Sequence, residues 1–373
     1  MAIDPNNLAA TAKLTFSDEF NSLSLWNGAS GTWGTQWFWD DLNGGWATSN
    51  GGTNANNDLE WYINANYSGT ATIDPWTVSN GVLSITADRA TPGTQQQIDG
   101  YAYTSGQMMS WHSFVQQYGY FEVSAKVPVG QGLWPAFWLL QQDGDWPPEI
   151  DVLEVTGNNV SLFYTSVHSN QTGQPSIVSN AHNVPDLSAA FHRYGVDWQR
   201  DYVTFYFDGQ KVAQYATPAD MNEPMYLLLN LAVGGSFPGN PNSATPFPSS
   251  YQVDYVRAYV DASVTALNGT TGGDTIIGGS ANEMISGVDG SDYLRGGDGD
   301  DYIFGGDGFD DVHGNTGNDT ERGGTGPDWV VGGQGDDLLY GEWGDDIVYG
   351  NLGSDTAYGG DSFVLVDAAS VGL

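Results

Sequence analysis

The sequence predicts an all-β protein in two parts, a β-sandwich or jelly roll over residues 1–262 and a parallel β-roll over residues 263–373. Two observations predict this class. Short segments that alternate apolar and polar residues, and break at Gly, Asn, Asp or Pro, run through the first part. A nine-residue period runs through the second part. A chain of 373 residues is long enough for two such domains.

The strands of the first part are predicted from alternation. The pattern is clearest over residues 82–87, 119–127, 203–207 and 251–260. Many strands at close spacing favour one all-β domain of about 200–250 residues. Helical periodicity is scarce, and the one helix that we expect is short and lies near residues 186–192.

The second part repeats the template G-G-x-G-x-D-x-U-x, where U is apolar, over residues 269–358. Residues 296–303 fit it fully. Gly permits the tight turns, and the U residue lies on a short inward-facing strand, so that stacked turns form one core. The apolar character of the U position is weakest at Glu321 and Ala357. A flexible Gly/Asp-rich linker is the alternative, and ten in-phase repeats disfavour it.

The acidic position of the template predicts calcium ligands, because carboxylate and backbone carbonyl oxygens suit this cation. Glu283 fills the second slot. The Asp recurs at Asp274, Asp292, Asp301, Asp310, Asp319, Asp328, Asp337, Asp346 and Asp355. Residues 269–358 contain 19 acidic and 2 basic residues, so we expect the segment to stay unfolded until Ca²⁺ binds.

The repeats resemble the RTX family of calcium-binding β-roll proteins. The resemblance implies export by a one-step (type I) secretion machinery that reads an uncleaved C-terminal signal, and residues 361–373 are acidic and apolar as such tails are. Residues 1–7 lack the basic segment and apolar run of a signal peptide. We therefore expect an extracellular monomer that is secreted without a cleaved N-terminal signal peptide.

Composition excludes several partners. The chain has 45 acidic and 9 basic residues and a formal charge of −36, which argues against nucleic acid and anionic membrane surfaces. No apolar stretch is long enough to insert into a membrane. The absence of cysteine excludes disulfides and thiolate metal sites.

The 14 Trp and 20 Tyr either line a groove for sugar rings or simply fill strands.

Three acids within residues 146–155 are the catalytic candidates. On a plain strand Glu149 and Asp151 face the same way, whereas Glu154, five residues after Glu149, faces the other. One β-bulge between Asp151 and Glu154 brings all three to one face. Crowded carboxylates shift each other's pKa and are typical of functional sites. Two carboxyls roughly 5–5.5 Å apart can carry out retaining glycoside hydrolysis; a solvated acidic strand or a cation site is the alternative.

The string 149–154 resembles the bulged signature of glycoside hydrolase family 16. Further strings that agree with that family follow in the same order. They span residues 16–21, 103–106, 132–138, 167–168, 194–198, 205–209 and 230–235. The resemblance implies a concanavalin A-like β-jelly roll in which Glu149 is the nucleophile, Glu154 the general acid/base, and Asp151 the residue that controls the nucleophile. The resemblance also implies that catalysis requires no cofactor.

The same resemblance implies the substrate-binding residues. They are Asn57, Glu60, Trp61, Trp134, Trp138, His168 and Asn230. Core packing is the alternative for Trp138, and a hydrogen-bonded strand histidine is the alternative for His168, which we expect near Glu154 or the sugar. Some relatives bind one structural Ca²⁺ through positions that match Glu19 and Asp254. Gln107 and Phe237 depart from relatives that cleave 1,3-glucans, where Arg and Trp are common.

These features predict a retaining endo-β-glycanase that hydrolyses internal β-1,3/β-1,4 bonds of a glucan or bacterial exopolysaccharide. A non-catalytic glycan-binding or biofilm matrix protein and a transglycosylase are the alternatives. Retention of all three acids favours an enzyme.

Overall fold

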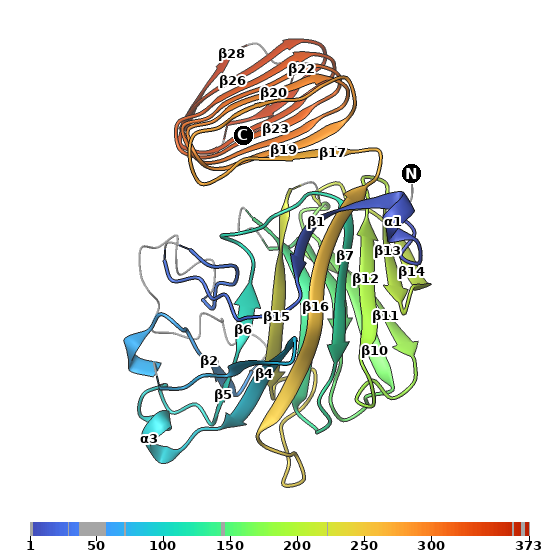
Figure 1. The fold of residues 1–373 in the computed structure, drawn as a ribbon, viewed down its shortest axis with the longest axis vertical. Coiled ribbons are helices and arrows are strands. Elements are labelled where there is room, and N and C mark those ends of the chain that lie inside the picture. Colours follow the sequence, from blue (N-terminus) through green and yellow to red (C-terminus); the bar gives the residue numbers. More distant parts are fainter. Residues whose placement is uncertain are drawn as a thin grey trace. The chain divides into compact units, whose positions relative to one another are not determined.

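The computed structural model describes residues 3–28, 30–36, 57–70, 72–142, 146–221, 223–359, 362–366 and 370–372. These residues form two compact units, one built mainly from residues 14–259 and the other mainly from residue 260 onward. We call them the sandwich and the β-roll, and Figure 1 shows the strands of each. No helix among the described residues has the length and apolar character needed to cross a membrane.

The first sheet of the sandwich has ten strands and contains the four segments with the clearest alternation. Its path runs through β14 (Gln210–Ala216), β13 (Tyr202–Phe207), β12 (His192–Trp198), β7 (Gly119–Lys126), β16 (Ser249–Asp261), β4 (Val82–Arg89), β5 (Tyr103–Ser105) and β2 (Glu60–Tyr62). Two further strands pair off this path, β1 (Ala12–Asp18) with β16 and β3 (Trp76–Ser79) with β4. The strands that alternation predicts are therefore confirmed as β4, β7, β13 and β16.

The second sheet of the sandwich has six strands and carries the three acids. Its order is β11 (Ser176–Asn183), β10 (Leu162–Ser169), β9 (Glu149–Glu154), β8 (Leu133–Gln141), β15 (Met225–Val233) and β6 (Gln107–Met109). All neighbours in this sheet are antiparallel. Alternate side chains of each strand therefore face the core or point away from it.

The main core contains inward side chains of both sheets. Phe121 and Val123 of β7, Phe137 and Leu139 of β8 and Ile150 of β9 are among its fully buried members. A smaller apolar cluster of Met109, Leu140, Tyr226 and Leu228 belongs to the six-stranded sheet, with Trp138 packed against it. This cluster takes alternate residues of β8 and β15, so it lies on the face that points away from the main core.

Helices are short in the described part of the chain: α1 (Leu8–Thr11), η2 (Ser68–Thr70) and α3 (Pro92–Gln95). The helix expected near residues 186–192 is wrong. Asp186 instead starts a turn, in which its carboxylate accepts hydrogen bonds from the Ser188 amide and hydroxyl. Strand β12 then begins at His192. A side chain that bonds its own backbone nearby competes with helix formation.

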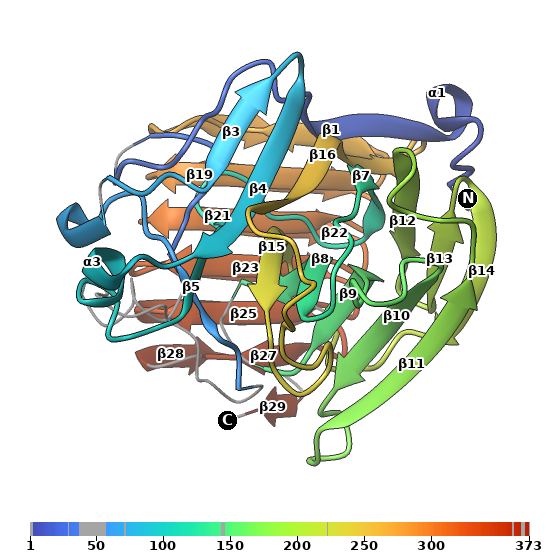
Figure 2. The ribbon, with the colours of Figure 1, turned by 90° about the horizontal axis from the view of Figure 1, so that it is seen from below.

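The β-roll consists of two parallel sheets between which the chain alternates. One contains β17 (Thr265–Asn268), β19 (Glu283–Gly290), β21 (Tyr302–Gly308), β23 (Thr320–Thr325), β25 (Leu338–Trp343), β27 (Thr356–Tyr358) and β29 (Ser370–Gly372), which lie side by side in Figure 2. The other contains β18 (Thr275–Ile277), β20 (Tyr293–Asp298), β22 (Asp311–Thr316), β24 (Trp329–Gln334), β26 (Asp345–Leu352) and β28 (Ser362–Val366). The expected tail at 361–373 forms β28 and β29, and its side chains lie outside the described residues.

Each strand of the β-roll pairs with the strand two repeats later. Ile285 thus lies beside Ile303, and Leu294 lies beside Val312. These four residues are completely buried and form one cluster between the sheets. The all-β fold with a parallel β-roll is therefore confirmed, because each repeat adds one apolar side chain to a shared interior.

Candidate active site

Strand β9 carries the three acids, and a bulge determines which way they point. Asp151 lies opposite Ser166 of β10, whereas Glu154 lies opposite Tyr164. Two residues therefore separate the acids on β9, whereas one residue separates their partners on β10. The pairing of β9 with β8 shifts between Phe137 and Trp138. The extra residue turns Glu154 back to the face of Glu149 and Asp151, as the spacing of the three acids predicts.

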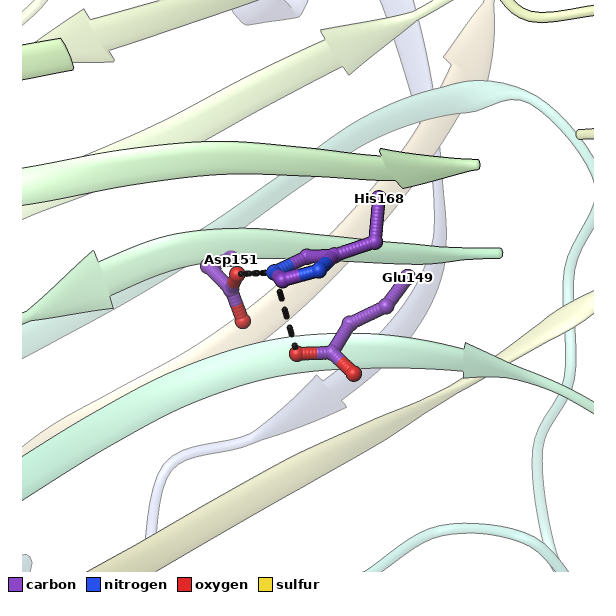
Figure 3. A group of neighbouring side chains, drawn as sticks. All are labelled: Glu149, Asp151 and His168. Atoms are coloured by element: carbon purple, nitrogen blue, oxygen red, sulfur yellow. Dashed lines mark hydrogen bonds and ion pairs between the residues drawn. The ribbon is translucent and has the colours of Figure 1, made fainter. Parts of the chain in front are cut away.

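His168 of β10 bridges two of the acids (Figure 3). Its Nε2 lies 2.9 Å from Asp151 Oδ2 and 3.8 Å from Glu149 Oε1. Glu149 also shares a hydrogen bond with Asp151. The register pairs His168 with Glu149 across the strands, so its hydrogen bond goes to Asp151 rather than to Glu154, and its expected contact with a sugar stays a prediction.

Each of the two glutamates accepts a hydrogen bond from a different indole. Trp146 Nε1 donates to Glu149 Oε2 at 2.6 Å, and Trp134 Nε1 donates to Glu154 Oε1 at 3.1 Å. Trp134 lies on β8, whereas Trp146 lies just before β9 and is 55% exposed. Sequence reasoning assigned no role to Trp146, although its position three residues before Glu149 was a usable signal.

Burial raises the pKa of all three acids. Desolvation and the Asp151 charge raise the pKa of Glu149 well above its usual value, against the opposing effects of His168 and the Trp146 N–H. Desolvation and the Glu154 charge likewise raise the pKa of Asp151. Desolvation and the Glu149 charge raise the pKa of Glu154 to about 7. Three such neighbours cannot all be ionised at neutral pH, so the cluster holds a proton that it can transfer.

A chain of hydrogen bonds holds the Trp138 side chain of β8 next to the acids. Trp138 Nε1 donates to Asn230 Oδ1 at 2.8 Å, and Asn230 Nδ2 donates to the Tyr62 hydroxyl at 2.9 Å. Trp138 pairs with Asp151 on one side and with Leu228 on the other. The indole of Trp138 is therefore held half-buried beside Asp151, on the face of the sheet that carries the acids.

Aromatic rings also flank Glu154. Phe237 contacts the Trp134 ring edge-on at 5.2 Å and the Tyr164 ring at 5.1 Å between centroids. Phe237 is 42% exposed. Tyr164 lies directly opposite Glu154 on β10. Sequence reasoning did not single out Tyr164, because only the register of the strands places it there.

Two predicted sugar contacts are buried instead. Trp61 is 3% exposed and belongs to the main core, where its ring meets Tyr101 edge-on. Glu60 is 1% exposed, and its Oε2 accepts a hydrogen bond from the Val233 amide. Glu60 and Trp61 point to opposite faces of β2, and both faces are covered, so their contact with a sugar stays a prediction. Asn57 is exposed and donates to the Ser236 hydroxyl at 3.3 Å.

The predicted calcium ligands form two ladders in the β-roll. The amide of one Asp donates to Oδ1 of the Asp 18 residues later, from Asp274 through Asp292, Asp310 and Asp328 to Asp346 along one ladder. The other ladder runs from Glu283 through Asp301, Asp319 and Asp337 to Asp355. The second carboxylate oxygen is buried and accepts no hydrogen bond at Asp292, Asp301, Asp310, Asp319, Asp328, Asp337 and Asp346.

These orphaned oxygens fit calcium. A side chain at Gly296 would collide with Asp301 Oδ2 and the Gly314 carbonyl, so the missing side chain leaves a carboxylate and a carbonyl oxygen facing one space. Desolvation raises the pKa of Asp328 to about 8, because burial disfavours the charged form of the carboxylate. Hard oxygen donors with no proton donor are a typical Ca²⁺ environment. Asp274 differs, because its Oδ2 accepts from the Thr270 amide and hydroxyl.

The calcium site at Glu19 and Asp254 stays a prediction, and the structure shows a protein partner for each of the two carboxylates. Glu19 accepts two hydrogen bonds from Arg257, at 2.7 and 2.8 Å. Asp254 accepts one from the Ser124 hydroxyl at 3.3 Å. Arg257 therefore neutralises the Glu19 carboxylate through a bidentate ion pair.

Comparison with known proteins agrees with both parts of the chain. The family model "Glycosyl hydrolases family 16" matches residues 63–257, and the model of the RTX calcium-binding nonapeptide repeat matches residues 286–321 and 322–357. Endo-1,3-1,4-beta-glycanase ExsH of Rhizobium meliloti is 46% identical over 245 residues, which cover 66% of this chain and 51% of that protein. EglC of the same organism is 44% identical over the same shares.

A solved structure extends the comparison to the fold. The laminarinase catalytic domain of Thermotoga maritima superposes with a TM-score of 0.54 at 29% identity, covering 67% of this chain and 98% of that one. The chain spans about half the length of the two rhizobial relatives. The likeness of the sandwich to a laminarinase domain confirms the jelly-roll architecture.

Proposed function

The chain belongs to glycosyl hydrolases family 16, and on that premise we propose that it is a retaining endo-β-glycanase. Its substrate is a glucan or bacterial exopolysaccharide with internal β-1,3 or β-1,4 bonds. The observation that carries this proposal is the bulge in β9, which brings Glu149, Asp151 and Glu154 to one face. Each acid there has its own hydrogen-bond partner.

The two glutamates divide the chemistry. Glu149 attacks the anomeric carbon as a carboxylate, and the bond from that carbon to the glycosidic oxygen breaks as Glu154 protonates the oxygen. The products of this step are a glycosyl ester of Glu149 and the released part of the polysaccharide, which carries a new hydroxyl group. Glu154, now ionised, takes a proton from water, and the hydroxide oxygen displaces Glu149 from the anomeric carbon. A pKa of about 7 for Glu154 suits an acid that must also act as a base.

Asp151 and His168 position the nucleophile rather than react. His168 Nε2 and Asp151 Oδ2 share a hydrogen bond at 2.9 Å, and Asp151 hydrogen-bonds Glu149. This arrangement favours one orientation of the Glu149 carboxyl group. The proton that Asp151 holds or releases sets how much of Glu149 is ionised, because neighbouring carboxylates disfavour each other's charge.

Aromatic rings on both sides of the acids support a sugar-binding role. Trp134 and Phe237 lie beside Glu154, and Trp146 lies beside Glu149. Sugar rings stack on exposed aromatic faces. Trp138 and Asn230 form part of the same face, and Asn57 extends it at an exposed position near Ser236.

The β-roll serves folding and export in this proposal. Ca²⁺ bound by the two Asp ladders stabilises the roll outside the cell, where calcium is abundant. The rhizobial relatives are endo-1,3-1,4-beta-glycanases, and the RTX repeats support secretion by a type I machinery. The roll makes no contribution to the chemistry, which belongs to the sandwich.

A polysaccharide panel tests the proposal. Wild type and the variant Glu149→Gln are incubated with mixed-linkage β-glucan, laminarin and an acidic bacterial exopolysaccharide, and reducing ends, product linkage and the initial product anomer are measured. We expect β-anomers from wild type on at least one polymer and almost none from the variant. Equal, negligible release by both proteins on every polymer would contradict an enzyme and favour a glycan-binding protein. Products longer than the substrate would indicate a transglycosylase.

A further inference from the structure

One residue breaks the apolar interior of the β-roll. The inward position of one sheet is occupied in turn by Ile285, Ile303, Glu321, Leu339 and Ala357, each paired with the next. Glu321 is fully buried. The described interior divides at this point into one apolar cluster that contains Ile303 and a second that contains Leu339.

The carboxylate of Glu321 approaches the calcium ladder of its own edge. One oxygen each from Asp319, Glu321 and Asp337 lies within 4.8 Å of the others. The Oδ2 atoms of the two aspartates are buried without a hydrogen-bond partner, and the Glu321 carboxylate, equally buried, interacts with the backbone of Gly314. A side chain at Gly314 would collide with both Asp319 Oδ2 and Glu321 Oε1, so these oxygens face the same small space.

Neighbouring basic groups do not explain this cluster. The 269–358 segment contains no Lys, two arginines, Arg295 and Arg322, and one histidine, His313, whose Nε2 lies 3.0 Å from Asp311 Oδ1. Arg322 follows Glu321 on the strand and so points to the opposite face, where it donates to Glu342 at 2.6 Å. Arg295 donates to Asp311 on the other sheet. Three buried carboxylates that repel one another are tolerated when a cation joins them.

We propose that Asp319, Glu321 and Asp337 form a calcium site whose third carboxylate comes from inside the β-roll. The other intervals of the two ladders use the carboxylates of one residue pair, whereas this interval adds a further acidic residue. More negative ligands bind Ca²⁺ more tightly. This interval is therefore the tightest site of the roll and the last to release its ion.

Calcium titration of the full chain tests the assignment. Chelator-treated wild type, Glu321→Gln and Glu321→Leu are titrated with CaCl₂ by isothermal calorimetry, and far-UV circular dichroism at saturating calcium checks that each variant folds. Leu restores the apolar residue of the repeat, so that variant retains a packed interior. We expect both variants to lose the tightest phase, with roughly tenfold weaker binding at that site and the weaker phases unchanged.

A double-mutant cycle locates the effect. Because Glu321 and Asp337 share one ion, the effect of Glu321→Gln should shrink in an Asp337→Asn background. Asp328→Asn removes an equivalent ligand from the opposite ladder and is the matched control, in which the effect of Glu321→Gln should persist. Identical isotherms for wild type and both Glu321 variants would overturn the proposal. So would an equal effect of Glu321→Gln in the Asp337→Asn and Asp328→Asn backgrounds, since Glu321 would then share no ion with Asp337.

Discussion

Removing the indole N–H that contacts Glu149, the proposed nucleophile, should slow glycosyl transfer and shift its pH dependence. The change is Trp146→Phe, which deletes the 2.6 Å bond to Glu149 Oε2 and keeps an aromatic ring. The N–H stabilises the ionised form of Glu149, so its loss raises the pKa of Glu149. Less nucleophile is then ionised at low pH, and the acid limb of the profile moves to higher pH.

The size of the effect follows from the hydrogen bond and its exposure. A hydrogen bond to a charged group contributes about 1.5–3 kcal/mol. Trp146 is 55% exposed, so water replaces part of the lost interaction, and about 1–2 kcal/mol is the reasonable range. At 1.36 kcal/mol per factor of ten, we expect kcat/KM to fall about 5- to 30-fold.

The assay is kcat/KM against pH on mixed-linkage β-glucan. Trp134→Phe is the matched variant at the other glutamate, because it removes the 3.1 Å hydrogen bond to Glu154. That bond lowers the pKa of Glu154, so its loss should move the alkaline limb of the profile to higher pH. Trp329→Phe, a 48% exposed ring of the β-roll, controls for a general effect of losing an indole. A Trp146→Phe profile that matches wild type in height and in its acid limb would refute the reasoning.

Three further predictions follow from the same contacts. The value of kcat/KM should fall as pH rises through about 7, since Glu154 must be protonated to release the leaving group and its pKa is raised to about 7; a profile flat to alkaline pH would contradict this role. Asn230→Ala breaks the bonds to Trp138 and Tyr62 and should raise KM about 3- to 30-fold with a smaller change in kcat, as two hydrogen bonds of about 1 kcal/mol each imply; steady-state kinetics with unchanged KM would count against it. Leu339→Ala should destabilise the β-roll by about 2–5 kcal/mol and raise the calcium concentration needed to fold it, while glycanase activity persists; circular dichroism during a calcium titration measures the first effect and a reducing-sugar assay the second.

Local patterns were sufficient to predict the parts of the fold that repeat or alternate. The nine-residue period predicts that the apolar residues of the repeats share one interior, where the structure places Ile285 beside Ile303. The acids required one extra step. Their spacing fails strict alternation, and only a bulge, which the structure has between Asp151 and Glu154, brings them together.

Contacts made across strands were beyond the sequence alone. His168 lies beside Glu149 because of the register between β9 and β10, which no local pattern fixes. Trp61 is polar at its indole nitrogen yet buried, since the path of β2 turns it into the core. Glu19 is neutralised by Arg257, 238 residues later in the chain. Each of these depends on long-range pairing rather than on composition or spacing.

The alternation of the β-roll between two sheets makes its length adjustable in steps. Because each Asp contacts the Asp 18 residues on, adding or removing two repeats leaves every later strand in its own sheet and ladder. A single added repeat would move all later strands to the opposite sheet, where similar repeats accept them. Gene duplication can therefore lengthen such a roll without redesign. Within the described interior from Leu267 to Ala357, the buried acid Glu321 distinguishes one turn of the β-roll from the similar turns on either side of it.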